Sequence, residues 1–413
     1  MNDKNKSSEK GQAIVYLAIG LAVFLGFVAL AIDGGMALAD RRHSQNAADS
    51  ASLAGGAAAS LVLENAHIDY SNWHCHHPAI QYADNTAISR AAANGFGIDT
   101  DQGDHNGVDT ICDQFDYGFF LDKYMDVTVD ISATTRSNFA QLLFPNAMHS
   151  EVDAVTRVRP RQPIVFGNAL VALSPQTCSG NKYGALFLGT GDTKLYGGGV
   201  FSNGCLRGNG TADVTVDGGG IYGHYLDIGG GSYSPAPEST TFTIPESNYD
   251  IPVPARDNHG NCIGAENVSG DLPANMHPGL WCVTGGLKLH GSYTGAGVTI
   301  VVLTGDIDIN ANTLIQLSAP ASSPNPSPAI PGVLIYLPMS NPSPVNLNGG
   351  ANSFLRGMII APRSDLTLNG NAGDYVKGQV ISWSVFVSGT NGFSIDYDPD
   401  EGYQQPTSIE LAK

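Results

Sequence analysis

The sequence is poor in charge, and its shortage of basic residues argues against nucleic-acid binding. Only 14% of the 413 residues are charged, and 20 lysines and arginines stand against 38 acidic residues, which leaves a net charge of −18. Such a chain repels a phosphate backbone unless its basic residues gather in a patch, and the sequence contains no basic patch. We therefore expect no nucleic-acid partner.

Motifs of the common enzyme classes are also missing. The sequence has no Walker loop, nucleophile elbow or dinucleotide-binding fingerprint, because Gly189-Thr190-Gly191 and the triple glycines lack the residues that must follow them. The 50 glycines show no Gly-X-Y period, which excludes a collagen-like chain. We expect a non-enzymatic protein without a cofactor.

Proline and glycine are unevenly distributed, which places a domain boundary near residue 160. Only three of the 23 prolines (Pro78, Pro145 and Pro160) precede residue 161. A chain of 413 residues suggests two or three domains on length alone. We expect residues 33–160 and the Gly/Pro-rich residues 161–413 to form domains of different architecture.

Residues 13–32 contain no charge and predict a transmembrane helix. About 20 apolar residues suffice to cross about 30 Å of hydrocarbon as a helix. A cleaved signal peptide is an alternative, because Ala37-Leu38-Ala39 has the A-x-A form, but signal h-regions usually run only about 7–15 residues. A buried core helix is a second alternative. We predict a cytoplasmic tail at residues 1–12, a retained anchor in the cytoplasmic (inner) membrane, and an extracytoplasmic or cell-surface body.

The segment from Asp33 to about Leu63 keeps a helical pattern and is rich in alanine. Small residues let helices approach closely. Two interpretations stay open, namely packing against partner helices in a membrane-rooted assembly, and ordinary packing within the segment's own domain.

The Gly-rich part contains a repeat of 21 residues. Residues 195–201 recur as 216–222, and residues 354–361 recur as 375–382. Short alternating strands separated by Gly and Asn turns are typical of solenoid coils, each of which buries its apolar face only against the next.

We therefore predict that residues 161–413 form an all-β, Gly-rich, right-handed parallel β-helix (solenoid). The Pro-rich residues 319–331 are interpreted as an insertion, because proline cannot donate to a sheet ladder. The irregular residues 234–281 are expected to interrupt the solenoid. A β-sandwich with long Gly-rich loops is the alternative.

An even number of cysteines suits an oxidising compartment. Six cysteines allow 15 pairings, so the sequence alone does not fix the disulfides. We favour the pairing of sequence neighbours because it keeps each bridge inside one unit, where it would stabilise the fold by about 2–4 kcal/mol. The three predicted disulfides are Cys75–Cys112, Cys178–Cys205 and Cys262–Cys282.

Two clusters carry metal-capable side chains without the spacing of a known metal site. Trp73-His74-Cys75-His76-His77 has neither a C-x₂-C nor an H-x₃-H spacing, so we interpret it as a solvated loop around a disulfide cysteine. Residues 99–109 fail the EF-hand frame, because Gly103 stands at position 5 and Thr110 at position 12. We interpret them as a turn, with calcium binding of another kind as the alternative, and we expect no metal site.

Asp306 and Asp308 are the strongest candidates for enzymatic chemistry. They stand two apart on a predicted strand and so share one face. Two carboxylates on one face could serve as acid and base in glycoside cleavage. The same pattern is ordinary for a solvated strand whose Ile307 and Ile309 are buried, and we favour that reading.

A resemblance to a known family is carried by the first 55 residues. An apolar span bracketed by short motifs is similar to the N-terminal segment of TadG-type proteins of the tight-adherence (Tad/Flp) pilus assembly system. The motif residues are Gly11, Gln12, Asp33, Gly34, Gly35, Arg41, Arg42, Gln45, Asn46, Ala47, Ala48 and Asp49. Prepilin processing in pilin-like proteins wants Glu at the fifth residue after the cleavage site, where this chain has Tyr16, so we expect the N-terminus to be kept.

The resemblance implies a small α+β pilin-like domain on the anchor helix, with strands near 127–131 and 152–158 and a short helix at 139–144. It implies other pilus-assembly membrane proteins or pilins as partners, and the solenoid as a spacer or binding surface. Two alternatives stay open. One is an adhesin or envelope structural protein that shares the anchor and binds a surface glycan or protein. The other is a β-helix polysaccharide lyase or hydrolase.

Overall fold

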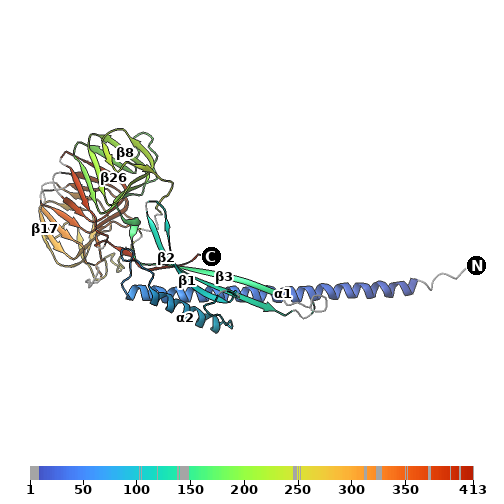
Figure 1. Ribbon diagram of the computed structural model, residues 1–413. Helices are drawn as coiled ribbons and strands as arrows, with labels where there is room; N and C mark the ends of the chain where they lie inside the picture. Colours follow the sequence, from blue (N-terminus) through green and yellow to red (C-terminus); the bar gives the residue numbers. More distant parts are fainter. Residues whose placement is uncertain are drawn as a thin grey trace, which may run out of the picture. The chain divides into compact units, whose positions relative to one another are not determined.

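The computed structural model divides the chain into two compact units, shown in Figure 1. The first comprises residues 1–115, 122–161 and 406–413, and the second comprises residues 116–121 and 162–405. The structure describes residues 9–101, 103, 105–118, 120–136, 139, 148–244, 249, 251, 253–310, 314–321, 328–348, 350, 352–370, 374–390, 392–399 and 401–412.

The first unit packs two helices against an antiparallel sheet. Its helices are α1 (Glu9–Asn65) and α2 (His77–Ala93). Its strands follow the spatial order β1 (Gly107–Asp116), β2 (Leu121–Thr135), β3 (Met148–Arg159) and β29 (Ser408–Leu411). The predicted helix at 139–144 lies, except for Phe139, outside the described residues.

Helix α2 is held by a stripe of alanines. Ala79, Ala83, Ala87 and Ala91 repeat every four residues and are buried. Residues four apart lie on one helix face, so a stripe of alanines lets α2 approach α1 closely. Pro78 stands in the first turn of α2, where its missing N–H costs no hydrogen bond.

The last strand of the chain belongs to the first unit. β29 pairs antiparallel with β3, with Ile409 opposite Val158 and Leu411 opposite Thr156. The second unit is therefore inserted between two neighbouring strands of the first, whereas the sequence analysis placed residues 406–413 with the Gly/Pro-rich domain. Its own two chain ends lie side by side, because β4 (Gln162–Pro163) pairs with β28 (Gln404–Gln405).

The rest of the second unit is built from two long parallel sheets, an arrangement compatible with a β-solenoid. We call β5 to β27 the parallel stack. The main path of the larger sheet is β12 (Glu238–Ser239), β10 (Ile221–Ile228), β8 (Gly199–Gly210), β5 (Asn168–Ala172), β26 (Val380–Gly389), β24 (Met358–Gly370), β21 (Val333–Tyr336), β18 (Val298–Val302), β15 (Gly279–Thr284) and β13 (Glu266–Ser269). Beside this path lie β6 (Ala185–Gly189), β16 (Leu287–Leu289), β19 (Ile307–Ile309) and β22 (Val345–Asn348).

The smaller parallel sheet runs beside the first in the same order of coils. Its strands are β11 (Ser232–Ser234), β9 (Asp213–Asp217), β7 (Thr193–Tyr196), β27 (Phe393–Asp396), β25 (Asp374–Lys377), β23 (Phe354–Arg356), β20 (Leu314–Ser318), β17 (Ser292–Ala296) and β14 (Asn275–Met276).

The 21-residue repeat is the distance along the chain between stacked residues. Leu195 pairs with Val216, and Leu355 pairs with Val376. Equivalent side chains therefore lie one above the other, and their apolar members form continuous columns in the core. One such column consists of Trp281, Ile300, Ile335, Ile359, Val380, Leu170, Val200 and Ile221.

Glycine is needed where the coils turn. Gly189 has φ of 131°, and a Cβ at this position would lie 2.6 Å from the carbonyl oxygen of Gly389 in the next coil. Only glycine combines that backbone conformation with so close an approach. The high glycine content of the second half has this structural origin.

The chain enters the stack in its middle. β5 lies between β8, which follows soon after it, and β26, which comes near the end of the chain. After β5 the chain adds β8, β10 and β12, which form one end of the larger sheet. It then crosses to β13 at the opposite end, and the following strands lead back to β26. The first and last coils of the stack therefore pack on each other.

The crossing segment covers the outer face of the larger sheet. Ile244, Tyr249 and Ile251 are buried there in one cluster with Tyr336 and Phe201 of the sheet. We call residues 240–265 the strap. The predicted interruption at 234–281 corresponds to the last strands of one stack end, the strap and the first strands of the other end. Of the predicted insertion at 319–331, residues 322–327 lie outside the described residues.

Candidate functional site

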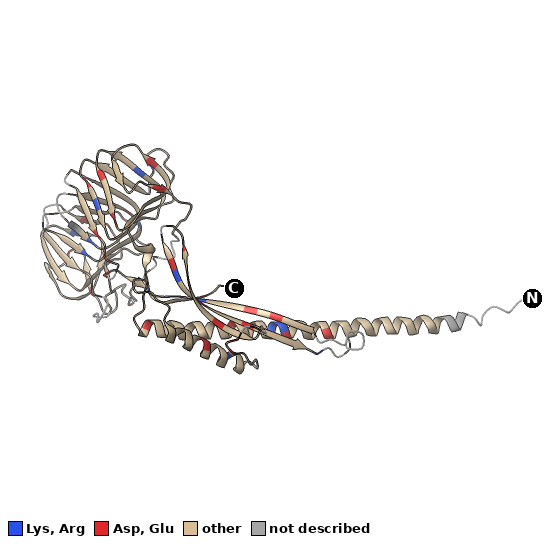
Figure 2. Ribbon diagram, viewed as in Figure 1, with Lys and Arg blue, Asp and Glu red and all other residues tan. Residues whose placement is uncertain are grey.

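The N-terminal part of α1 is an exposed apolar rod. α1 contains an apolar window long enough to cross a membrane, and none of that window is buried. Figure 2 shows this part of the helix without charged residues until the first acidic one. Burial begins at Asp33, which is 2% exposed and accepts a hydrogen bond from the backbone N–H of Phe139 at 3.0 Å.

The predicted family-motif residues lie along α1 on both sides of this transition. Gln45 donates to Asp49 at 2.8 Å and to the carbonyl oxygen of Asp153 on β3 at 3.1 Å. Ala47 and Ala48 are buried against the unit's own core. Of the others, Gly34 is half-buried, Gly35, Arg41, Arg42 and Asn46 are exposed, and the side chains of Gly11 and Gln12 lie outside the described residues.

Further along α1 the packing becomes close enough to require glycine. A Cβ on Gly55 would lie 2.9 Å from the carbonyl oxygen of Ala83 in α2. The hydroxyl of Thr156 on β3 donates to Ser52 at 2.9 Å. The small residues of α1 thus serve packing within their own unit, which is the second of the two interpretations left open by the sequence.

One face of α1 in this region is exposed and partly apolar. Leu53, Ala57 and Leu61 follow one another at intervals of four and are exposed, with Leu61 at 65%. We call these three residues the leucine stripe. Residues four apart share a helix face, so the stripe forms one continuous surface.

A ladder of arginines occupies alternate positions at the end of β3 and just after it, and the sequence analysis missed it. Arg157 pairs with Asp126 at 2.8 Å, Arg159 pairs with Asp122 at 2.8 Å, and Arg161 pairs with Glu64 at 2.6 Å. The alternation Arg-x-Arg-x-Arg after a predicted strand is a signal that could have revealed one charged face. Because each guanidinium is paired, the ladder is structural.

Three residues of this ladder have shifted pKa values, and the first is Arg157, whose hydrogen bonds to Asp126 raise its pKa. Burial acts to lower the pKa of Arg159, but the hydrogen bonds that it donates to Asp122 and Glu410 outweigh this effect and raise the pKa. The hydrogen bond from Arg161 holds the pKa of Glu64 below its usual range, against a smaller effect of burial. The raised pKa values of the two arginines and the lowered pKa of Glu64 all favour the charged forms.

The six cysteines form three disulfides. They are Cys75–Cys112, Cys178–Cys205 and Cys262–Cys282. This is the neighbour pairing favoured from the sequence, and it places one bridge in the first unit and two in the second. The third bridge ties the strap to β15, because Cys262 lies in the strap and Cys282 in the strand.

The histidine cluster ends at the first residue of α2, and the rings of His74 and His76 meet edge to face. Nδ1 of His76 lies 3.4 Å from Nε2 of His74. In the acidic loop, carboxylate oxygens of Asp99 and Asp101 accept backbone N–H groups within the same turn, as a turn interpretation requires. Among the described residues no group of three or more His, Cys, Asp or Glu side chains is arranged to hold a metal ion.

Asp306 and Asp308 lie where the sequence placed them, on the solvated side of β19. Ile307 and Ile309 are fully buried, and the two carboxylates are partly exposed. Asp308 pairs in register with Lys288 and Asn346 of the adjacent coils. Asp308 therefore belongs to a row of outward polar side chains.

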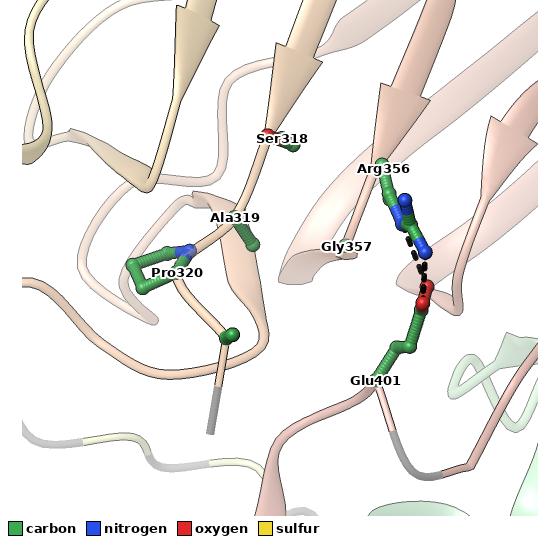
Figure 3. A pocket seen from close by; sticks show the side chains of 7 residues that line it. Ser318, Ala319, Pro320, Arg356, Gly357 and Glu401 are labelled. Atoms are coloured by element: carbon green, nitrogen blue, oxygen red, sulfur yellow. Dashed lines mark hydrogen bonds and ion pairs between the residues drawn. The ribbon is translucent and has the colours of Figure 1, made fainter. Parts of the chain in front are cut away.

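A hollow of about 340 Å³ opens beside β20 and β23. Figure 3 shows Arg356 on its wall, paired with Glu401 through two hydrogen bonds, one of them 2.8 Å long. The Arg356 hydrogen bond holds the pKa of Glu401 below its usual range. The remaining described lining residues add no carboxylate, histidine or other acid–base group to this pair. They are Ser318, Ala319, Pro320, Ala321 and Gly357.

Comparison with known protein families identifies the N-terminal segment. Residues 11–59 match the Tad family of Flp pilus-assembly TadE/G-like proteins. The match covers the exposed apolar rod and the small-residue part of α1, and it agrees with the TadG-like segment predicted from the motifs. No curated protein and no solved structure matches the chain significantly.

Proposed function

We propose that the protein is a non-enzymatic, single-pass membrane component of Tad/Flp pilus assembly. The TadE/G-like match at residues 11–59 carries this proposal, because it spans both the apolar rod and the part of α1 that packs into the first unit. Deletion of the gene should therefore remove surface pili.

The proposed topology places the N-terminus in the cytoplasm and both units outside the cytoplasmic membrane. The unburied apolar window of α1 supports an anchor. Three disulfides support an oxidising compartment for the rest of the chain. A membrane-impermeant reagent should label exposed Lys288 in spheroplasts, and protection of the body from that reagent would contradict the topology.

We propose that the first unit is pilin-like. A long N-terminal helix whose apolar first half is exposed and whose second half packs on an antiparallel sheet supports this comparison. Its partners would be other pilus-assembly membrane proteins or pilins.

The leucine stripe is the surface that we assign to these partners. Ala47 and Ala48 are buried in the unit's own core and cannot meet another helix, whereas Leu53, Ala57 and Leu61 remain exposed. Exposed leucines at helical spacing next to a membrane anchor suit an apolar stripe on a partner helix.

The variant Leu53→Glu/Leu61→Glu tests this assignment. We expect fewer pili at an unchanged level of membrane-inserted protein. The matched control is Tyr82→Glu, which adds a charge at an aromatic residue of α2 that is 59% exposed, close to the exposure of Leu61. Equal pilus numbers in both variants would show that the stripe is not the partner surface.

We propose that the second unit is a right-handed parallel β-helix that acts as a spacer or binding surface. The strand at its start, β4, pairs with the strand at its end, β28, so residues 162–405 close on themselves as one unit. The outward row containing Lys288, Asp308 and Asn346 is polar and solvated, as suits contact with a glycan or protein rather than a membrane.

The absence of enzymatic activity is part of the proposal. The solvated setting of Asp306 and Asp308 and the paired state of Arg356 and Glu401 support it. Incubation of the protein with cell-surface polysaccharides should release no fragments. Cleavage that disappears in Asp306→Ala or Asp308→Ala would overturn this part of the proposal and favour the polysaccharide enzyme.

A further inference from the structure

We infer that His74 and His76 form a two-ligand site for a tetrahedral divalent metal ion such as Zn²⁺. The residues flank Cys75 in the loop before α2, and Nε2 of His74 lies 3.4 Å from Nδ1 of His76. Three observations support the proposal. They are the separation of these two nitrogens, the hydrogen bond between Nδ1 of His74 and the carbonyl oxygen of Asn72, and the hydrogen bonds and disulfide that hold the loop.

The separation matches the geometry of a zinc site. Zinc–nitrogen bonds are about 2.0–2.1 Å long, and two such bonds at a tetrahedral angle place their nitrogens about 3.3–3.4 Å apart. A right angle, as in square-planar copper, would place them only about 2.9 Å apart at the same bond length. The observed 3.4 Å therefore favours a tetrahedral ion.

A hydrogen bond fixes which nitrogen of His74 is available. Nδ1 of His74 lies 3.0 Å from the carbonyl oxygen of Asn72. A carbonyl only accepts, so Nδ1 carries the proton and donates, and Nε2 presents its lone pair toward His76. Metal-binding histidines commonly donate their other N–H to a backbone carbonyl in this way.

The carbonyl that orients His74 is itself held in place. The backbone N–H of Asn72 donates to Asp69 at 3.1 Å, and its side-chain amide donates to the carbonyl oxygen of His67 at 2.9 Å. On the other side, Cys75 is bonded to Cys112 of β1. The loop thus orients the His74 ring, and the disulfide ties the backbone beside both histidines to β1, before any ion binds, which reduces the entropy lost on binding.

The metal-free pair requires a proton between the two rings. Two lone pairs 3.4 Å apart repel each other, so one nitrogen of the pair must be protonated when no ion is present. When Zn²⁺ binds both nitrogens, that proton moves to the other nitrogen of its own ring or to solvent. His74 is exposed and His76 half-buried, so the other two positions of a tetrahedral ion are open to water or to a ligand from another molecule.

Calorimetric titration of the untagged full-length protein in detergent with ZnCl₂ tests the proposal. We expect binding of one Zn²⁺ per chain that weakens at least about tenfold in His74→Ala and in His76→Ala. The matched control is His77→Ala, which removes the neighbouring exposed histidine and should leave the affinity unchanged.

The outcomes separate this site from the other histidines of the chain, of which there are 11 in total. Unchanged affinity in His74→Ala and His76→Ala, an equal loss in His77→Ala, or no binding by the wild-type protein would each overturn the proposal. Co²⁺ gives a second readout, since a visible absorption band of tetrahedral intensity should appear in the wild type and in His77→Ala only.

Discussion

Arg159 on β3 donates a hydrogen bond of 2.6 Å to Glu410 on β29, although 251 residues separate them along the chain. The same guanidinium pairs with Asp122 on β2 at 2.8 Å. One arginine therefore connects three strands of the first unit and attaches the end of the chain that returns from the second.

The two carboxylates bound to Arg159 should differ in their contribution to stability. Asp122 is buried, whereas the Glu410 side chain is 54% exposed. Removal of a buried partner leaves the Arg159 charge less well compensated, so Asp122→Ala should lower the free energy of unfolding by about 3 kcal/mol. Glu410→Ala should lower it by less than about 1 kcal/mol. Denaturant unfolding of both variants in detergent measures the difference, and equal losses would refute this account of the ladder.

The contact between α1 and α2 should not tolerate a methyl group at Gly55. A Cβ there would lie 2.9 Å from the Ala83 carbonyl oxygen and 3.0 Å from Val127. Alanine gains about 1 kcal/mol of helix propensity, but overpacking costs about 1–3 kcal/mol, so we expect a net loss for Gly55→Ala.

The control for Gly55→Ala lies in the same helix. A Cβ on Gly35 would have no neighbour within 4 Å. Gly35→Ala should therefore leave the melting temperature unchanged or raise it. If both variants melt at the wild-type temperature or above, α1 and α2 do not approach as closely as described.

The strap should depend on one buried asparagine. The side chain of Asn203 donates to the carbonyl oxygens of Leu173 and Ile244, and accepts the N–H of Ile244 at 2.7 Å. Asn203→Ala leaves these groups unpaired and should lower the free energy of unfolding by about 2 kcal/mol.

A milder change on the same face provides the comparison for Asn203→Ala. Tyr336 donates its hydroxyl to the carbonyl oxygen of Ile251 in the strap at 2.9 Å. Tyr336→Phe removes that one bond and should cost about 1 kcal/mol. Hydrogen exchange of strap amides should increase in both variants, and more strongly in Asn203→Ala. The opposite ranking would contradict the role given to Asn203.

Stability should decrease in acid partly through Glu401. The Arg356 hydrogen bond lowers the pKa of Glu401 in the folded protein below its ordinary value of 4.5. A lowered folded pKa stabilises the fold above the unfolded value, and this contribution is lost as the pH falls through the folded value. Because the pair is partly exposed, we expect an effect below about 1 kcal/mol.

Unfolding of the wild type and of Glu401→Gln between pH 6 and pH 3 measures this contribution. The wild type should lose more stability over that interval than the variant, because glutamine does not titrate. Parallel curves would show that the pair with Arg356 does not form in solution.

The stacking of coils could be predicted from the sequence because repeated residues pair directly. The distance from Leu195 to Val216 in the sequence is their register in the sheet. The order of the coils could not be predicted in this way. Every coil presents a similar apolar face to its neighbours, so nothing local indicates that Val380 pairs with Leu170 rather than with a coil nearer in sequence.

Two further features were missed for physical reasons. β29 is only four residues long, and its place beside β3 depends on tertiary pairing rather than on local propensity. Val165 and Phe166 adopt φ values of 51° and 58°, a conformation that their side chains disfavour and that no sequence pattern announces. In both cases the surrounding structure overrides local preference.

The candidate site was predicted best where a motif carries it and least where side chains meet by folding. The family motif identified the anchor segment from residue types alone. The facing nitrogens of His74 and His76 could not be predicted, because their spacing depends on the hydrogen bond from His74 to Asn72.

The measurement that tests the central claim most directly is a pilus count by negative-stain electron microscopy on cells that lack this gene, with a complemented strain as control. We predict that surface pili disappear in the deletion strain and return when the full-length chain is restored. Pili of unchanged number and length in the deletion strain would contradict a role in assembly, and adhesion through the second unit would then become the function to test.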